Sequence, residues 1–188
     1  MIRRRVGSVS MRLGLALALM LLPACGGEDP TVPGVPPTAA TPGGMTLASH
    51  PLREGTFPVE FTCDGADTSP PMEWSGVPDQ AAELVLSLVD PEAPGGPFVH
   101  WVVYGIEPAD GSVEAGEVPA DGVEGTNDFD RTGYGGPCPP AGETHDYVLA
   151  LLASSTTLEL EPGASLFDVT QAMGAPLAAA QLTASYGR

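Results

Sequence analysis

Short apolar runs, separated by clusters of proline and glycine, fill the sequence from residue 45 to residue 188. These runs are rich in valine, leucine and aromatic residues, which is typical of β-strands. The Pro/Gly clusters between them predict turns. The predicted strands fall at residues 59–62, 83–89, 98–106, 147–153 and 181–186.

The segment from Ser165 to Ala180 has a helical pattern instead. Ser165 is a favoured residue for the start of a helix, while Gly174 and Pro176 divide the segment into two short pieces. The predicted fold is therefore mainly β, a β-sandwich with one or two short helices near the C-terminus.

The first 24 residues have the pattern of a secretory signal. Four arginines precede an apolar run at residues 13–22, which is too short to span a bilayer comfortably. The following Leu22-Pro23-Ala24-Cys25 is similar to a bacterial lipobox, although Pro23 is unusual at its position, and predicts cleavage before Cys25 and lipidation of that cysteine. The alternatives are an uncleaved membrane anchor and ordinary cleavage near Ala24 without a lipid.

Residues 25–44 are rich in proline, glycine and threonine, with almost no large apolar residue, and this composition predicts a flexible tether. Residues 45–188 have the size of one ordinary domain with a single core. We therefore predict an exported domain in a bacterial cell envelope, on the periplasmic or the cell-surface side, held to the membrane by a lipid on Cys25.

Removal of the signal leaves a strongly acidic protein. All 24 acidic residues follow Cys25, whereas Arg53, Arg131 and Arg188 are the only basic residues that remain, so the formal charge becomes −21. A nucleic-acid partner requires a basic surface, and we exclude nucleic-acid binding for that reason. Charge attraction to an anionic membrane is excluded likewise, which leaves the lipid on Cys25 as the membrane contact.

Several segments place a carboxylate, an imidazole or a stiff Pro/Gly turn at the end of an apolar run, where a rigid sheet can hold functional groups. They are Phe-Thr-Cys-Asp-Gly-Ala-Asp-Thr-Ser-Pro-Pro (residues 61–71), Asp-Pro-Glu-Ala-Pro (90–94), Phe-Val-His-Trp (98–101), Gly-Tyr-Gly-Gly-Pro-Cys-Pro-Pro (133–140) with His-Asp-Tyr (145–147), and Ser-Tyr-Gly-Arg (185–188). Together they resemble the phosphatidylethanolamine-binding protein family, in particular its bacterial Raf kinase inhibitor-like branch. The resemblance extends from Met45 to the C-terminus and implies the same β-sandwich.

The resemblance implies a pocket for a small anion such as phosphate, or for a phosphoethanolamine-like phospholipid headgroup. The implied pocket residues are Asp90, Pro94, His100, Gly136, Pro137, Cys138, His145 and Tyr147. For two of them a structural role is the alternative, because Asp90 before Pro91 can cap a turn and His100 can be a core residue. Strand alternation predicts that His100 shares a face with Val102, where its imidazole can donate to a phosphate or pair with Asp90.

The loop at residues 133–142 combines glycines with three prolines. Because proline has no N–H, the loop is a poor cradle of backbone amides, and we expect it to form a rigid wall of the pocket. Many family members have arginine where this chain has Asp146, which weakens the case for a doubly charged phosphate. We interpret Asp64 and Asp67 as loop residues that cap turns and support the pocket.

With Cys25 lipidated, Cys63 and Cys138 are the remaining thiols, an even pair in an oxidising compartment. The family resemblance brings their two loops toward the same end of the sheet. We therefore predict a Cys63–Cys138 disulfide, and a free, buried pair is the alternative.

The sequence does not predict catalysis. The histidines and cysteines fit no common zinc spacing, and no Gly-x-Ser-x-Gly elbow is present, although Asp90, His100 and His145 could perform acid–base chemistry. We predict a binding protein without metal or cofactor. The alternative function, which the family name suggests, is inhibition or regulation of an extracytoplasmic protease or another protein partner.

Overall fold

The computed structural model describes residues 44–188. The predicted signal (residues 1–24), Cys25 and the tether up to residue 43 lie outside the described residues and stay predictions. Among residues 44–188, no helix has both the length and the apolar character needed to cross a membrane.

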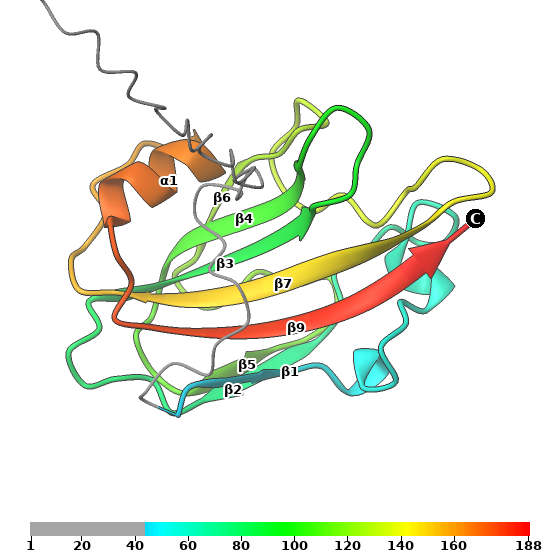
Figure 1. Cartoon of the computed structure of the whole chain (residues 1–188). Helices are drawn as coiled ribbons and strands as arrows, with labels where there is room; N and C mark the ends of the chain where they lie inside the picture. The colour runs from blue at the N-terminus through cyan, green and yellow to red at the C-terminus, as the bar shows by residue number, and fades with distance from the viewer. Residues whose placement is uncertain (1–43) are drawn as a thin grey trace, which may run out of the picture. The chain divides into compact units, whose positions relative to one another are not determined.

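The described residues form two β-sheets and one α-helix, which confirms the predicted mainly β fold (Figure 1). The larger sheet has the strand order β8-β6-β4-β3-β7-β9, and the smaller sheet has the order β1-β2-β5. The elements are β1 (Thr46–Ala48), η1 (His50–Leu52), η2 (Val59–Phe61), β2 (Met72–Ser75), β3 (Glu83–Asp90), β4 (Phe98–Ile106), β5 (Gly111–Val113), β6 (Val123–Thr126), β7 (Thr144–Ser154), β8 (Gly163–Ser165), α1 (Leu166–Met173) and β9 (Ala178–Gly187).

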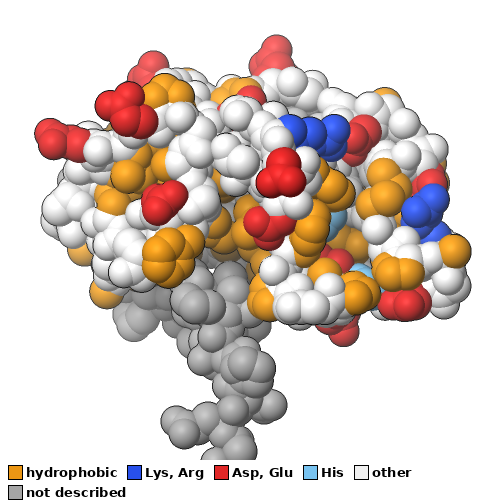
Figure 2. Space-filling model, turned by 90° about the horizontal axis from the view of Figure 1, so that it is seen from above, with side chains coloured by type: hydrophobic (Ala, Val, Ile, Leu, Met, Phe, Trp, Pro, Cys, Tyr) orange, Lys and Arg blue, Asp and Glu red, His pale blue; other side chains and the backbone are white. Residues whose placement is uncertain are grey.

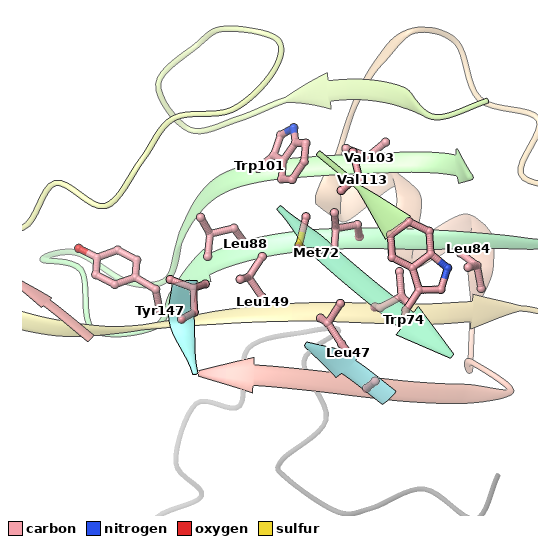
Figure 3. Close-up of a cluster of buried hydrophobic side chains, with 14 of the residues drawn as sticks. Leu47, Met72, Trp74, Leu84, Leu88, Trp101, Val103, Val113, Tyr147 and Leu149 are labelled. Atoms are coloured by element: carbon pink, nitrogen blue, oxygen red, sulfur yellow. The ribbon is translucent and has the colours of Figure 1, made fainter. Parts of the chain in front are cut away.

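Two apolar clusters cover the two faces of the larger sheet. Between the sheets, Leu84 and Leu88 of β3 belong to a cluster that includes Met72 of the smaller sheet (Figure 3). On the opposite face, Val85 and Val89 of the same strand belong to a second cluster, which includes residues of α1. Because both faces are covered, β3 is buried along its whole length, and this explains why apolar residues fill both faces of the strand between Leu84 and Val89.

The helix α1 begins with a capping box. The Ser165 hydroxyl accepts a hydrogen bond from the Asp168 N–H, and the Asp168 carboxylate accepts one from the Ser165 N–H. Gly174 ends the helix with a positive φ of 67°. The predicted second helical piece is wrong, because Ala178 already begins β9 and pairs with Ala153 of β7. Pairing along β7 outweighs the helix preference of the alanines at 178–180.

Four of the five predicted strands are confirmed as β3, β4, β7 and β9. The fifth, at residues 59–62, is wrong, because Val59–Phe61 forms the short 3₁₀ helix η2. Thr62 then turns back and donates to the Val59 carbonyl through both its N–H and its hydroxyl. The strands that the pattern does not predict have three or four residues each, too few for a periodicity to be visible.

Candidate functional site

Three strand ends converge at one end of the larger sheet. β3 ends at Asp90, and both of its antiparallel neighbours begin there, β4 with Phe98 opposite Asp90 and β7 with Thr144. In Figure 1 this end lies toward the right, on the side of the C-terminus, whereas α1 lies toward the left. The topology thus gathers Asp90, His100 and His145 from segments far apart in the sequence.

A β-bulge in β4 changes the direction of His100. Adjacent residues of β3 pair with Trp101 and with Val99, so His100 between them is an extra residue without a partner in β3. Val99 and Val102 consequently share the α1 face of the sheet, while the centroid of the His100 ring lies 5.2 Å from that of Tyr147 in the cluster between the sheets. The prediction that His100 shares a face with Val102 is wrong, because simple alternation does not hold across a bulge.

His100 is buried, and its Nδ1 lies 2.7 Å from the Gly135 carbonyl oxygen and 3.1 Å from that of Gly136. Since carbonyl oxygens only accept hydrogen bonds, Nδ1 carries a proton and donates. Burial lowers the pKa of His100, against smaller opposing effects of these carbonyls and of Asp90, and so favours the neutral ring. In neutral His100, Nε2 is an acceptor, which suits an O–H or N–H of a ligand and not a bare phosphate oxygen.

His145 contacts a carboxylate at each ring nitrogen. Nδ1 lies 2.7 Å from Oδ2 of Asp90, and Nε2 lies 3.1 Å from Oε2 of Glu143. Both contacts are hydrogen bonds only when both nitrogens carry a proton, so the arrangement favours the imidazolium. The hydrogen bond to Asp90 is the main cause that raises the pKa of His145; burial opposes it, and the Glu143 contact adds to it. The structure therefore pairs Asp90 with His145 and not with His100.

Asp90 also caps the turn that follows β3. Its Oδ1 accepts a hydrogen bond from the Glu92 N–H at 2.8 Å, while Oδ2 accepts from His145. The turn begins with Pro91, which holds the preceding residue in an extended conformation. The two interpretations of Asp90 are thus compatible, because each carboxylate oxygen serves one of them.

A cavity of about 240 Å³ opens beside these residues. Figure 2 shows histidine surface (pale blue) in small areas between hydrophobic side chains (orange). The lining contains no lysine or arginine, so His145 is its cationic group. The lining consists of the predicted pocket residues Asp90, Pro94, His100, Cys138 and His145 together with Ala93, Phe98, Phe129, Pro139 and Pro140.

Gly136 and Pro137 lie behind this lining and support it. A Cβ atom on Gly136 would come within 2.5 Å of the Phe61 carbonyl oxygen, so the close approach of the two loops requires glycine. The Gly136 N–H donates to Oδ1 of Asp67 at 2.7 Å, and the Pro137 carbonyl accepts from the Cys63 N–H at 3.2 Å. Asp67 thus has the supporting position that the sequence analysis gives it.

Tyr147 lies next to His100, between the cavity and the core. Figure 3 shows its hydroxyl pointing away from the other labelled side chains. This hydroxyl is fully buried, lies close to the Asp90 carboxylate and the Cys138 N–H, and forms no hydrogen bond of normal distance and angle among the described residues. Tyr147 is therefore next to the cavity and is not part of its lining. Burial, and secondarily the charge of Asp90, raises the pKa of Tyr147, so the hydroxyl keeps its proton and remains available as a donor.

A disulfide joins Cys63 to Cys138, the two cysteines that the sequence analysis pairs. Because Cys138 lines the cavity, this bond fixes the cavity wall to the loop at residues 61–67. The Tyr134 hydroxyl, which donates to the Phe61 carbonyl at 2.6 Å, connects the same two segments.

The glycine amides of the loop are occupied by protein acceptors. The N–H of Gly133 donates to the Gly125 carbonyl, that of Gly135 donates to the His100 carbonyl, and that of Gly136 donates to Asp67. These amides are not free to hold a ligand, so the loop acts as a wall and not as a cradle of N–H groups.

Two residues of the site, Phe129 and Glu143, lie outside the motif segments and are not found by sequence reasoning. Four other lining residues lie within those segments but are not predicted as pocket residues, namely Ala93, Phe98, Pro139 and Pro140. Phe129 lies in an acidic turn, is 40% exposed, and its ring contacts those of Phe98 and His100. A large aromatic residue within the polar stretch Asn-Asp-Phe-Asp-Arg is the signal that could have indicated it. Glu143 gives no such signal, because one more carboxylate in a turn of an acidic protein looks like an ordinary surface residue.

Within residues 44–188, no three His, Cys, Asp or Glu side chains are grouped so that they could hold a metal ion. The cavity instead surrounds a small space with a carboxylate, a neutral imidazole, an imidazolium and a nearby buried hydroxyl. This set offers donors and acceptors to one small ligand that carries both kinds of group.

The fold and the cavity define a two-sheet β-protein with a ligand-sized pocket at one end of its larger sheet. The family model for phosphatidylethanolamine-binding protein matches residues 49–187. This chain belongs to the phosphatidylethanolamine-binding protein family, which confirms the resemblance found in its motifs.

Individual relatives agree with this assignment. A UPF0098 protein of Methanothermobacter thermautotrophicus is 44% identical over 151 residues, which cover 77% of this chain and 99% of that protein. LppC of Mycobacterium tuberculosis, which is named as a lipoprotein, is 43% identical over 176 residues, covering 85% of this chain and 86% of that protein. The crystal structure of the phosphatidylethanolamine-binding protein homologue CT736 of Chlamydia trachomatis has a TM-score of 0.72 and 32% identity, over 78% of this chain and 99% of that one.

Proposed function

We propose that this protein binds a small phosphate-bearing ligand, in particular a phosphoethanolamine-like phospholipid headgroup, in the cavity at the end of β3. The observation that carries the proposal is the small cavity at which the imidazolium of His145, the carboxylate of Asp90 and the acceptor Nε2 of His100 meet. The family name supports the same class of ligand.

The charges around the cavity favour a zwitterion over a simple anion. The imidazolium of His145 is a charged donor for a phosphate oxygen. The carboxylates beside it, the acceptor Nε2 of His100 and the aromatic rings of Phe98 and Phe129 suit an ammonium group. A ligand with phosphate at one end and ammonium at the other matches both sets.

The size of the cavity limits the ligand further. At about 240 Å³ it is smaller than the pockets of roughly 300–1,000 Å³ that enclose drug-sized molecules. A headgroup therefore fits, whereas acyl chains would remain outside, over the exposed Phe129 and Pro140. We propose that the ligand is bound and not transformed, because the lining has no serine, threonine or lysine and its cysteine is in a disulfide.

Isothermal titration calorimetry tests this function. The purified chain is titrated with inorganic phosphate, phosphoethanolamine and short-chain phosphatidylethanolamine, and compared with His145→Ala, His100→Ala and the control His50→Ala. Loss of one charged hydrogen bond predicts at least about tenfold weaker binding for His145→Ala, and no change for the control. Equal heats from all four proteins would contradict the proposal.

We also propose that the protein is exported and anchored in the cell envelope by a lipid on Cys25. The sequence Leu22-Pro23-Ala24-Cys25 supports this, as does the similarity to LppC, which covers more of the chain than the described domain alone. Metabolic labelling with radioactive palmitate should label the wild type in the membrane fraction, and Cys25→Ser should remain unlabelled. Equal labelling of both proteins, or no labelling of the wild type, would contradict the anchor.

A second candidate function is regulation of an extracytoplasmic protease or another protein partner. Phe129 favours it, because this ring is exposed at the cavity mouth and lies 5.3 Å from the Arg131 guanidinium, and aromatic and arginine side chains are enriched at the centres of protein interfaces. Inhibition of purified envelope proteases by the wild type, reduced in Phe129→Ala, would support this function. Absence of inhibition by the wild type would remove it.

A further inference from the structure

The two carboxylates that contact His145 differ in accessibility. The Asp90 side chain is 4% exposed and also accepts from the Glu92 N–H, so it is fixed on the inner side of the ring. The Glu143 side chain is 52% exposed and lies in the turn that precedes β7. Only the backbone of Glu143 is tied to its surroundings by further hydrogen bonds, from its N–H to Pro140 and from the Arg188 N–H to its carbonyl. Its carboxylate can therefore turn away without disturbing the fold.

The atom that Glu143 contacts is the donor that an anionic ligand needs. Nδ1 of His145 is engaged by Asp90, and Nδ1 of His100 is engaged by the carbonyls of Gly135 and Gly136. Nε2 of His145 is thus the imidazole N–H at the cavity that a ligand can reach, and Oε2 of Glu143 lies 3.1 Å from it. The Glu143 carboxylate occupies the place of a ligand oxygen.

An anion that binds His145 must therefore displace Glu143. The displaced carboxylate then stays close to His145 without its cationic partner, where it repels a second negative charge. An ammonium group on the same ligand would give it a new partner. Displacement is consequently less favourable for a simple anion than for a zwitterion.

We propose that Glu143 determines the selectivity of the pocket, by competing with simple anions for Nε2 of His145 and by pairing with the ammonium group of a zwitterionic phosphate ester. This inference rests on the proposed function, since it requires that a phosphate binds in this cavity. It assigns to Glu143 a role in discrimination and leaves the phosphate contact to His145.

Two ligands of the same shape separate the contribution of the phosphate group to binding from that of the ammonium group. Phosphoethanolamine and propyl phosphate differ at the end of a short chain, where the first carries an ammonium group and the second a methyl group. Glu143→Gln removes the carboxylate charge at His145. Asp146→Asn is the matched control, because it removes one negative charge from the residue that directly follows His145 in β7. The side chain of Asp146 is exposed on the face opposite to that of His145.

Calorimetry of the full chain should show that the wild type prefers phosphoethanolamine by about fivefold, the upper value for a partly exposed ion pair. In Glu143→Gln, propyl phosphate should bind several-fold more tightly than in the wild type, and the preference should fall toward one. Asp146→Asn should keep the wild-type preference. Binding of propyl phosphate by Glu143→Gln but not by the wild type would support the inference in its strongest form.

An unchanged preference in Glu143→Gln, with both ligands still bound, would overturn the role of Glu143 and leave the proposed function standing. A preference lost equally in Asp146→Asn would also overturn it, because the effect would then be one of overall charge. Absence of binding of either ligand to every variant would overturn the proposed function and this inference together.

Discussion

The middle of β3 and its end are buried to nearly the same degree, but the middle buries an apolar side chain and the end buries a charged one. Leu88 is 0% exposed in the cluster between the sheets, and Asp90, two residues later, is 3% exposed beside the cavity. Burial of Leu88 is favourable by itself, whereas a buried carboxylate is tolerated only when it is paired and hydrogen-bonded. One strand can thus supply stability in its middle and a candidate ligand site at its end.

The structure that surrounds β3 also differs between the middle of the strand and its end. Around the middle of β3, the register with β7 is regular from Glu83 to Val89. Around its end, a bulge at His100, a disulfide at Cys138 and the close approach of Gly136 hold the polar groups in place. A second irregularity in the pairing of β3 with β4 lies between Leu84 and Leu86, away from the cavity, so it is the combination of bulge, disulfide and close glycine approach that distinguishes the site.

Removal of the disulfide should have the largest effect, because this bond connects the cavity wall to the rest of the domain. Cys63 and Cys138 are 75 residues apart in sequence, which in a chain-entropy account predicts a loss of roughly 4 kcal/mol in the free energy of unfolding. Urea unfolding of the Cys63→Ser/Cys138→Ser double variant measures it. A double variant as stable as the wild type would contradict the structural role of the bond.

Truncation in the middle of β3 should reduce stability and leave the cavity intact. Leu86→Ala removes a buried side chain and is expected to lower the free energy of unfolding by about 3 kcal/mol. Val59→Ala, at a position that is 55% exposed, is the control and should change little. Weaker phosphoethanolamine binding by folded Leu86→Ala would show that the two regions are not separable.

The charges of Asp90 and His145 at the end of β3 should make the free energy of unfolding depend on pH. The pKa of His145 is raised by Asp90, so the stabilisation from its proton is fully present below about pH 6.5 and is lost as the pH rises through the raised pKa. The pKa of His100 is lowered by burial, so this residue reduces stability only as the pH falls below about 6.5. The free energy of unfolding of the wild type should therefore decline as the pH rises above about 6.5 and through the raised pKa of His145.

Asp90→Asn should lower stability near pH 6.5 by about 1.5 kcal/mol and flatten that decline. Imidazole NMR titration should place His145 above 6.5 and His100 below it in the wild type, and should move His145 downward in Asp90→Asn. Titration of both histidines on the same side of 6.5 would contradict the different environments that the structure gives them.

The smallest effect on the free energy of unfolding is expected from a substitution at α1, which covers the opposite face of the larger sheet. Ser165→Ala removes the capping hydroxyl and should lower the free energy of unfolding by about 1 kcal/mol. It should also raise the pKa of Asp168, which the hydrogen bonds from Ser165 lower. Thermal unfolding and calorimetry on the same sample provide the check, and a change in ligand affinity would argue against independence of the two regions.

Much of the fold follows from the sequence, because a strand buried on both faces leaves a mostly apolar run without regular alternation, as residues 83–89 and 98–106 do. The three-residue strands are too short to show such an apolar run. The alanines at 178–180 have a helical preference, and only the position of β7 beside them shows that they form a strand. The bulge at His100 is likewise set by pairing with another strand, so alternation within β4 alone cannot predict it.

For the candidate site, the motifs indicate Asp90, His100 and His145, but not which of them form a pair. The hydrogen bond between Asp90 and His145 joins residues 55 positions apart, and the protonation states of the two histidines depend on burial and on such partners. Glu143 has no sequence signal at all, since its contact with His145 arises only from the turn before β7.

The most direct test of the central claim is a crystal structure of the protein with phosphoethanolamine. We expect the ligand in the cavity, with a phosphate oxygen within hydrogen-bond distance of Nε2 of His145 and with Glu143 turned away from that nitrogen. An empty cavity at saturating ligand, with Glu143 still on His145, would contradict that claim.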